Sequence, residues 1–91
     1  MRFGPYFAKS LEKAGFSQSS FAAKVGYRQQ NVNQIIKGKR PPPLSRVDAW
    51  ASALGKHIDK DLFLDLAHLE HCTPRIQKMV AELWAETKRE V

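Results

Sequence analysis

The segment that most constrains the fold is residues 18–38, which read QSSFAAKVGYRQQNVNQIIKG. Apolar residues recur at helical spacing in two short runs, which predicts helices over residues 18–25 and 29–37. Gly26 can take the positive φ that ends the first of them. Ala22, in the middle of that first helix, is small enough for the second helix to cross it closely. The segment therefore predicts two helices joined by a short turn that contains glycine, the helix-turn-helix arrangement.

A row of amide side chains follows the turn. Because the aliphatic side chains of this second helix point toward a core, a rotation of about 100° per residue places the amides on the outward side. An amide presents a donor beside an acceptor, which matches N6 and N7 of adenine in the major groove. The alternative is an ordinary polar face in contact with solvent. We expect the base-reading residues to be Gln29, Gln30, Asn33 and Gln34.

The net charge of +6 is concentrated in the first half of the chain. Nine Lys and Arg residues lie at or before Arg46, against the single acid Glu12, whereas the remainder is slightly acidic. This asymmetry indicates a polyanion as the partner of the first half, although a solvated surface would look similar. The residues expected to hold DNA phosphates are Gln18, Arg28, Lys37, Lys39 and Arg40.

These features together resemble the Cro/C1-type (XRE family) helix-turn-helix. The residues that carry the resemblance are Gln18, Ala22, Gly26, Val32 and Gly38, followed by KGKRP and by WASALG at 50–55. It covers roughly residues 7–55, and the glutamine pair is similar to that of lambdoid phage repressors. The resemblance implies a dimer on a two-fold operator, with half-sites about one helical turn apart. It also implies base contacts from the residues matching Gln29, Gln30 and Gln34, and a phosphate contact from Gln18.

Three positions depart from that pattern. Arg28 stands where a small hydroxyl residue is usual before the second helix. Leu11 and Ile36 stand where some relatives pair charges, so apolar packing is expected instead. The three prolines at 41–43 are unusual and are expected to reposition the helix that follows.

No run of residues alternates as a strand would, so the fold expected is all-α, a five- or six-helix lambda-repressor-like domain. An extra C-terminal amphipathic helix is expected to open with Thr73 and Pro74. The whole chain, 1–91, is taken as one domain, with a DNA-binding core at 6–66 and the C-terminal helix at 73–90. The other helices are expected over 6–14, from Pro43 to about Gly55, and over 62–69.

The C-terminal helix carries one unbroken apolar face, made of Ile76, Met79, Val80, Leu83 and Trp84. Such a face either folds back onto the monomer core or packs against a second copy or another protein. A third alternative divides the face, with Ile76 and Val80 in the monomer core and Trp84 at the interface. Because an operator-binding protein of this kind needs a dimer, self-association is favoured. We expect its residues to be Met79, Leu83 and Trp84.

Other classes of function find little support. His68, His71 and Cys72 lie at helical spacing, but no fourth metal ligand appears at a familiar distance, so no metal is expected. No nucleophile, base and orienting group occur together in a recognisable catalytic motif, so we expect neither an enzyme nor a cofactor. The lone cysteine, the absence of a long apolar run and the lack of a signal peptide indicate a cytoplasmic, nucleoid-associated protein and no membrane contact.

The sequence therefore predicts a sequence-specific regulator that binds double-stranded DNA, a phage- or prophage-type repressor acting as a homodimer on a pseudo-palindromic operator. Two alternatives remain open. One is an antitoxin that autoregulates its operon and binds a toxin through the C-terminal helix. The other is a protein-interaction module without DNA binding.

Overall fold

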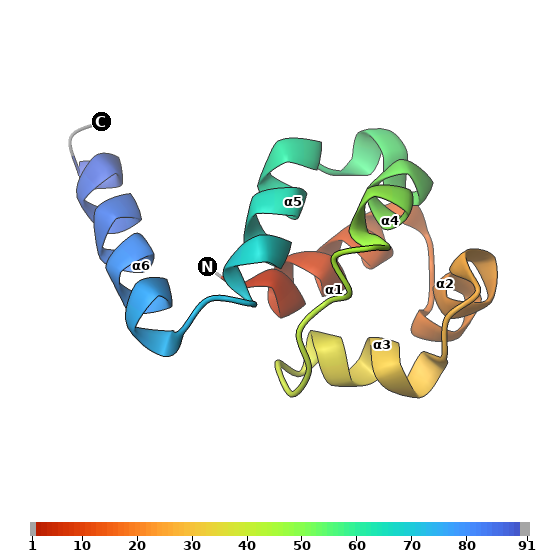
Figure 1. Cartoon of the computed structure of the whole chain (residues 1–91). Coiled ribbons are helices and arrows are strands. Elements are labelled where there is room, and N and C mark those ends of the chain that lie inside the picture. The colour runs from red at the N-terminus through yellow and green to blue at the C-terminus, as the bar shows by residue number, and fades with distance from the viewer. Residues whose placement is uncertain (1, 90–91) are drawn as a thin grey trace.

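The computed structural model describes the backbone of residues 2–89 and the side chains of residues 2–83. This part of the chain forms six α-helices, one 3-10 turn and no strand, which confirms the all-α fold expected from the sequence. The elements in Figure 1 are α1 (Phe3–Ala14), α2 (Gln18–Val25), α3 (Gln29–Ile36), α4 (Val47–Leu54), η1 (Gly55–His57), α5 (Lys60–Leu69) and α6 (Pro74–Arg89).

Aromatic rings join the first five helices into one core. The Phe7 ring in α1 lies nearly parallel to the indole of Trp50 in α4, with ring centroids 5.4 Å apart. The same ring meets Phe21 of α2 and Phe63 of α5 edge to face, at 5.4 and 6.0 Å. None of the four side chains is more than 1% exposed. This cluster fixes α2, against which α3 packs, relative to the rest of the domain.

Helix α1 begins at Phe3, three residues before the expected start at Tyr6. Pro5 falls within the first turn, where its missing N–H costs no helical hydrogen bond. Phe3 is completely buried, and Gly4 lies so close to the Ile36 carbonyl at the end of α3 that a Cβ would collide with it. The early start thus follows from contacts with distant elements, which the local pattern does not contain.

Helix α4 begins at Val47 instead of the expected Pro43. Residues 44–46 form a turn, in which the Arg46 N–H donates to the Pro43 carbonyl at 3.0 Å. Pro43 is compatible with the first position of a helix, but here it precedes the turn that leads into α4.

Helix α5 begins at Lys60, two residues before the expected Leu62. Its N-cap is Asp59, whose carboxylate accepts the Leu62 N–H at 3.2 Å. The 3-10 turn η1 between α4 and α5 was not expected from the sequence.

Helix α6 stands at the opposite end of the molecule from α2, along its longest dimension of 40 Å (Figure 1). Pro74 is its first residue, as expected, and the Ile76 N–H donates to Thr73 Oγ1 at 3.4 Å. Its apolar face does not fold into the core, because Ile76, Met79 and Leu83 are 46, 54 and 59% exposed. The inward position suggested for Ile76 was therefore wrong, and Val80 is only partly buried. None of the described helices is long and apolar enough to cross a membrane.

Candidate nucleic-acid interface

The turn between α2 and α3 has the geometry that the sequence predicts. Gly26 adopts φ 69° and ends α2, and the Tyr27 N–H donates to the Ala22 carbonyl at 2.9 Å. At the start of α2, Ser17 Oγ accepts the Ser20 N–H at 3.0 Å while Ser20 Oγ accepts the Ser17 N–H at 2.9 Å. This reciprocal capping satisfies two otherwise unpaired donors and stabilises an α2 of only eight residues. Helix α3 thus packs against an α2 whose two ends are both capped.

Helix α3 buries its aliphatic side and presents its amide side outward. Val32 and Ile35 are at most 2% exposed, and Ile36 is half-buried. Gln29 and Gln30 are exposed, as the 100° rotation per residue predicts. The other two amides, Asn33 and Gln34, are only half-exposed. The first turn of α3 is therefore the most accessible part of the amide row.

A hydrogen bond joins two residues for which the sequence indicates separate roles. Asn33 Nδ2 donates to Gln18 Oε1 at 3.1 Å, across 15 residues of chain. The bond links the start of α2 to the middle of α3 and uses one of the two N–H groups of Asn33. Gln18 keeps its own NH₂ group for an acceptor such as a phosphate oxygen. The sequence analysis did not predict this pair. The small residue Ala22 was a signal that α2 and α3 cross closely.

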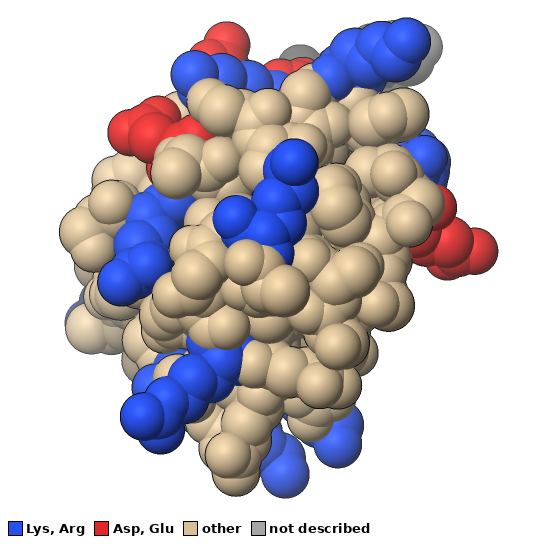
Figure 2. Space-filling view, turned by 90° about the vertical axis from the view of Figure 1, so that its right-hand side faces the viewer, with Lys and Arg blue, Asp and Glu red and all other residues tan. Residues whose placement is uncertain are grey.

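Of the five residues expected at phosphates, Gln18 is the first residue of α2, and the other four lie at the two ends of α3. Arg28 is the N-cap residue of α3 and is exposed, and its side chain makes no capping hydrogen bond. Lys37, Lys39 and Arg40 are all exposed and follow the end of α3, where Gly38 turns the chain with φ 76°. The lower part of Figure 2, on the side of the molecule where α3 lies, shows Lys and Arg side chains and no acidic ones. Both ends of α3 are thus suited to contact polyanion backbones.

Arg46 is a basic residue for which the sequence suggested no role. Its guanidinium carbon lies 5.3 Å from the centroid of the Tyr27 ring, beside the helix-turn-helix turn. Tyr27 in turn packs edge-on against Trp50 at 5.3 Å. This cation–π contact places an exposed arginine near the α2–α3 turn, and no local motif would have revealed it.

The residues considered for a metal do not converge. The Nδ1 atom of His68 contacts the Leu64 carbonyl at 2.8 Å, and His71 contacts the Pro42 carbonyl through Nε2. Cys72 Sγ lies 3.7 Å from the His68 carbonyl oxygen. Among the described residues there is no group of three His, Cys, Asp or Glu side chains that could hold a metal ion.

Two of the three residues expected at a dimer contact can be placed. Met79 and Leu83 lie on the exposed face of α6. Trp84 lies outside the residues whose side chains are described.

The comparison with known proteins agrees with the helix-turn-helix geometry of α2 and α3. A family model described as "Helix-turn-helix" matches residues 8–60, more than half of the chain. This range contains α2, α3 and α4 entirely and most of α1. No curated protein and no solved structure matched the chain.

Proposed function

Because the chain belongs to the XRE-type (Cro/C1-type) helix-turn-helix family of DNA-binding transcription regulators, we propose that it is a sequence-specific repressor of phage or prophage type. It acts as a homodimer on a pseudo-palindromic operator, with α3 of each copy in the major groove. The family is a regulatory one and is generally non-enzymatic.

One observation carries the proposal: the outward face of α3 is made of amides, whereas its inward face is fully apolar. Gln29 and Gln30 are exposed, and Val32 and Ile35 behind them are buried. An exposed amide on a firmly packed helix meets the geometric requirement for bidentate contact with adenine. In this proposal Gln29, Gln30 and Gln34 read base edges, and Asn33, oriented by Gln18, adds to the same surface.

The side chains around α3 hold the DNA backbone. Lys37, Lys39 and Arg40 extend beyond the end of the helix, and Arg28 lies at its start. Gln18 contacts a phosphate at the N-terminus of α2, where the helix dipole favours an anion. Arg46 beside Tyr27 is a further candidate for a phosphate contact. These contacts provide register and most of the salt dependence, whereas the amides provide the preference for sequence.

The experiment that tests the proposal is selection of bound sequences from a random pool of DNA, followed by affinity measurements across salt concentrations. Enrichment of a two-fold site with adenine in each half-site, together with a steep fall in affinity with salt, is expected. Salt-dependent binding without an enriched site would reduce the amides to a polar surface and refute sequence-specific recognition. Absence of DNA binding would refute the proposal and would direct attention to a protein partner.

A further inference from the structure

Two basic residues of α1 have no role in the proposed DNA contacts. Lys9 and Lys13 are exposed and lie one helical turn apart. In the part of the chain that the structure describes, no ion pair joins either lysine to an acid. They border a hollow on the surface of α1 together with Glu12, the single acid of this helix. This face of α1 is therefore basic, and a basic face is complementary to an anionic partner.

A second hollow adjoins the first and covers the first two turns of α1. It has a volume of about 420 Å³ and a mostly apolar surface, and we call it the α1 furrow. Its lining residues are Arg2, Pro5, Tyr6 and Lys9. At a rise of about 1.5 Å per residue, Arg2 and Lys9 lie about 10 Å apart along the helix, with Pro5 and Tyr6 between them. The α1 furrow thus has an apolar floor and a cation at each end.

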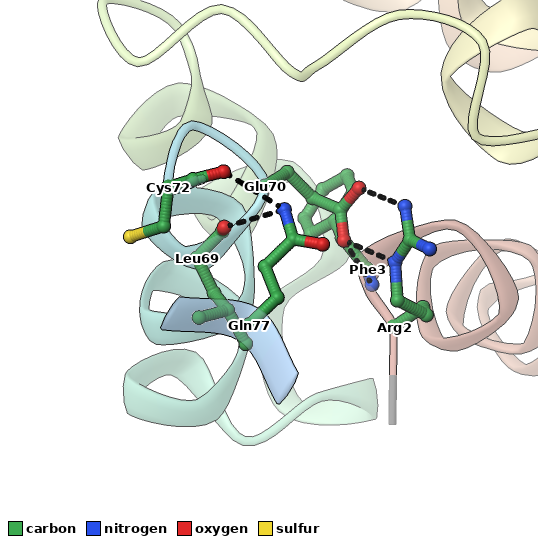
Figure 3. A network of polar contacts seen from close by, with 6 residues as sticks. All are labelled: Arg2, Phe3, Leu69, Glu70, Cys72 and Gln77. Atoms are coloured by element: carbon green, nitrogen blue, oxygen red, sulfur yellow. Dashed lines mark hydrogen bonds and ion pairs between the residues drawn. The ribbon is translucent and has the colours of Figure 1, made fainter. Parts of the chain in front are cut away.

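Two of these four side chains are held in place by other elements. The Arg2 guanidinium donates two hydrogen bonds of 2.7 Å to the Glu70 carboxylate, which uses two of its five N–H groups (Figure 3). The Tyr6 hydroxyl accepts the Asp59 N–H at 3.0 Å, and the Tyr6 ring packs against Phe63 with centroids 6.4 Å apart. Side chains that are already fixed lose little conformational entropy when a partner binds. Arginine and tyrosine are also enriched at protein interfaces.

We propose that the α1 furrow binds an acidic peptide segment of another protein, in which an apolar side chain lies between carboxylates. The apolar side chain covers Pro5 and Tyr6, while the carboxylates pair with Arg2 at one end and Lys9 at the other. The distance of about 10 Å between these cations corresponds to about three residues of extended chain. A nucleic-acid strand would also pair with the cations, but its phosphates would leave the apolar floor in water. The combination of charge and apolar surface therefore favours a peptide.

The α1 furrow is separate from the amide row. Helix α1 packs on the inward side of α3, because Gly4 lies against the Ile36 carbonyl, whereas the amides point outward. In Figure 1, α3 lies at the lower edge of the molecule and α1 lies above it. At its N-terminal end the furrow adjoins a smaller hollow that reaches Lys37, one of the proposed phosphate contacts. A peptide in the furrow leaves the outward face of α3 free, so this partner goes beyond the proposed function.

Selection from a random library of displayed eight-residue peptides tests the proposal, with the full chain as bait and no DNA present. Enriched peptides are expected to carry an apolar residue between acidic ones. The affinity of the labelled peptides is then measured by fluorescence anisotropy for the wild type, Lys9→Glu and Lys78→Glu. Lys78 is an exposed residue of α6, so its reversal changes the net charge equally and is the matched control. We expect at least about tenfold weaker binding in Lys9→Glu and less than about twofold in Lys78→Glu.

The apolar floor is tested on the peptide itself. Replacement of its apolar residue by glycine should weaken binding by about tenfold or more, because a buried large side chain contributes about 1.5–3 kcal/mol. In NMR spectra of the wild type, the amide signals that shift on peptide addition should be those of residues 2–13.

Several results would overturn the proposal. Equal weakening in Lys9→Glu and Lys78→Glu, or no effect of the glycine replacement, would indicate general attraction between opposite charges. Failure to enrich any peptide over the Lys9→Glu bait would show that the furrow binds no such segment, and concentration-dependent shifts of residues 2–13 without peptide would identify a second copy as the occupant. Displacement of the peptide by duplex DNA, together with tenfold weaker DNA binding in Lys9→Glu, would assign the furrow to the DNA surface. Because the selection is done without DNA, a failure of the proposed function leaves this test intact.

Discussion

Replacement of Gln29 by alanine tests the link between the outward face of α3 and sequence preference. Gln29 is the first residue of α3 and is exposed, so its amide supports no packing in the folded chain. The free energy of unfolding is therefore expected to change by no more than about 0.5 kcal/mol. Any loss of DNA binding can then be attributed to the contact itself.

The expected loss follows from two identical half-sites. A good bidentate contact to a base discriminates by about 1–3 kcal/mol, and a homodimer loses it twice. If the half-sites contribute independently, binding of the selected operator weakens by about 2–6 kcal/mol. This corresponds to about 30-fold to more than 10⁴-fold in dissociation constant. Binding to scrambled DNA should hardly change.

Fluorescence anisotropy titrations on operators with every half-site position substituted in turn would measure this. Gln29→Ala is expected to lose its preference at one position per half-site and to keep the others. Lys39→Ala is the matched control, because the loss of a phosphate contact weakens all sequences alike and lowers the salt slope. An unchanged ratio of operator to scrambled affinity in Gln29→Ala would refute the assignment of this residue to base reading.

Three further predictions concern the scaffold. Phe7→Ala should lower the free energy of unfolding by about 3–5 kcal/mol in urea titrations, because it empties the centre of the aromatic cluster; a loss below 1 kcal/mol would contradict that role. Ala22→Leu should cost about 1–3 kcal/mol and reduce operator affinity, because it forces α3 away from α2; unaltered binding would mean that the crossing tolerates bulk. Hydrogen bonds from Arg2 hold the pKa of Glu70 below its ordinary value, so their stabilisation is present above the usual glutamate pKa of about 4.3 and is lost as the pH falls further. Glu70→Gln should remove that part of the pH dependence of the free energy of unfolding, measured in unfolding titrations between about pH 6 and 3. The change in the free energy of unfolding should be less than about 1 kcal/mol, because Arg2 is half-exposed. An identical pH profile in both proteins would refute the contribution of the pair.

The elements whose signals are local could be predicted from the amino-acid sequence. The ends of α2 follow from Ser17 and Gly26, and the two faces of α3 follow from its periodicity. A cap, a glycine with positive φ and a 3.6-residue repeat all act within a few residues. For this reason the helix pair and the outward direction of Gln29 and Gln30 could be predicted without knowledge of the remaining chain.

Other features depend on contacts between residues far apart in the chain, and no local pattern contains them. The early start of α1 is stabilised by Glu70, which accepts the Phe3 N–H across 67 residues. The contact of Gln18 with Asn33 and the place of Arg46 over Tyr27 require α2, α3 and the turn before α4 to be packed together. The periodicity of α6 predicted an apolar face but not whether the monomer would bury it. That outcome depends on how α6 is placed against the end of α5, where Gln77 donates to the Leu69 and Cys72 carbonyls, and this placement is a property of the packed molecule.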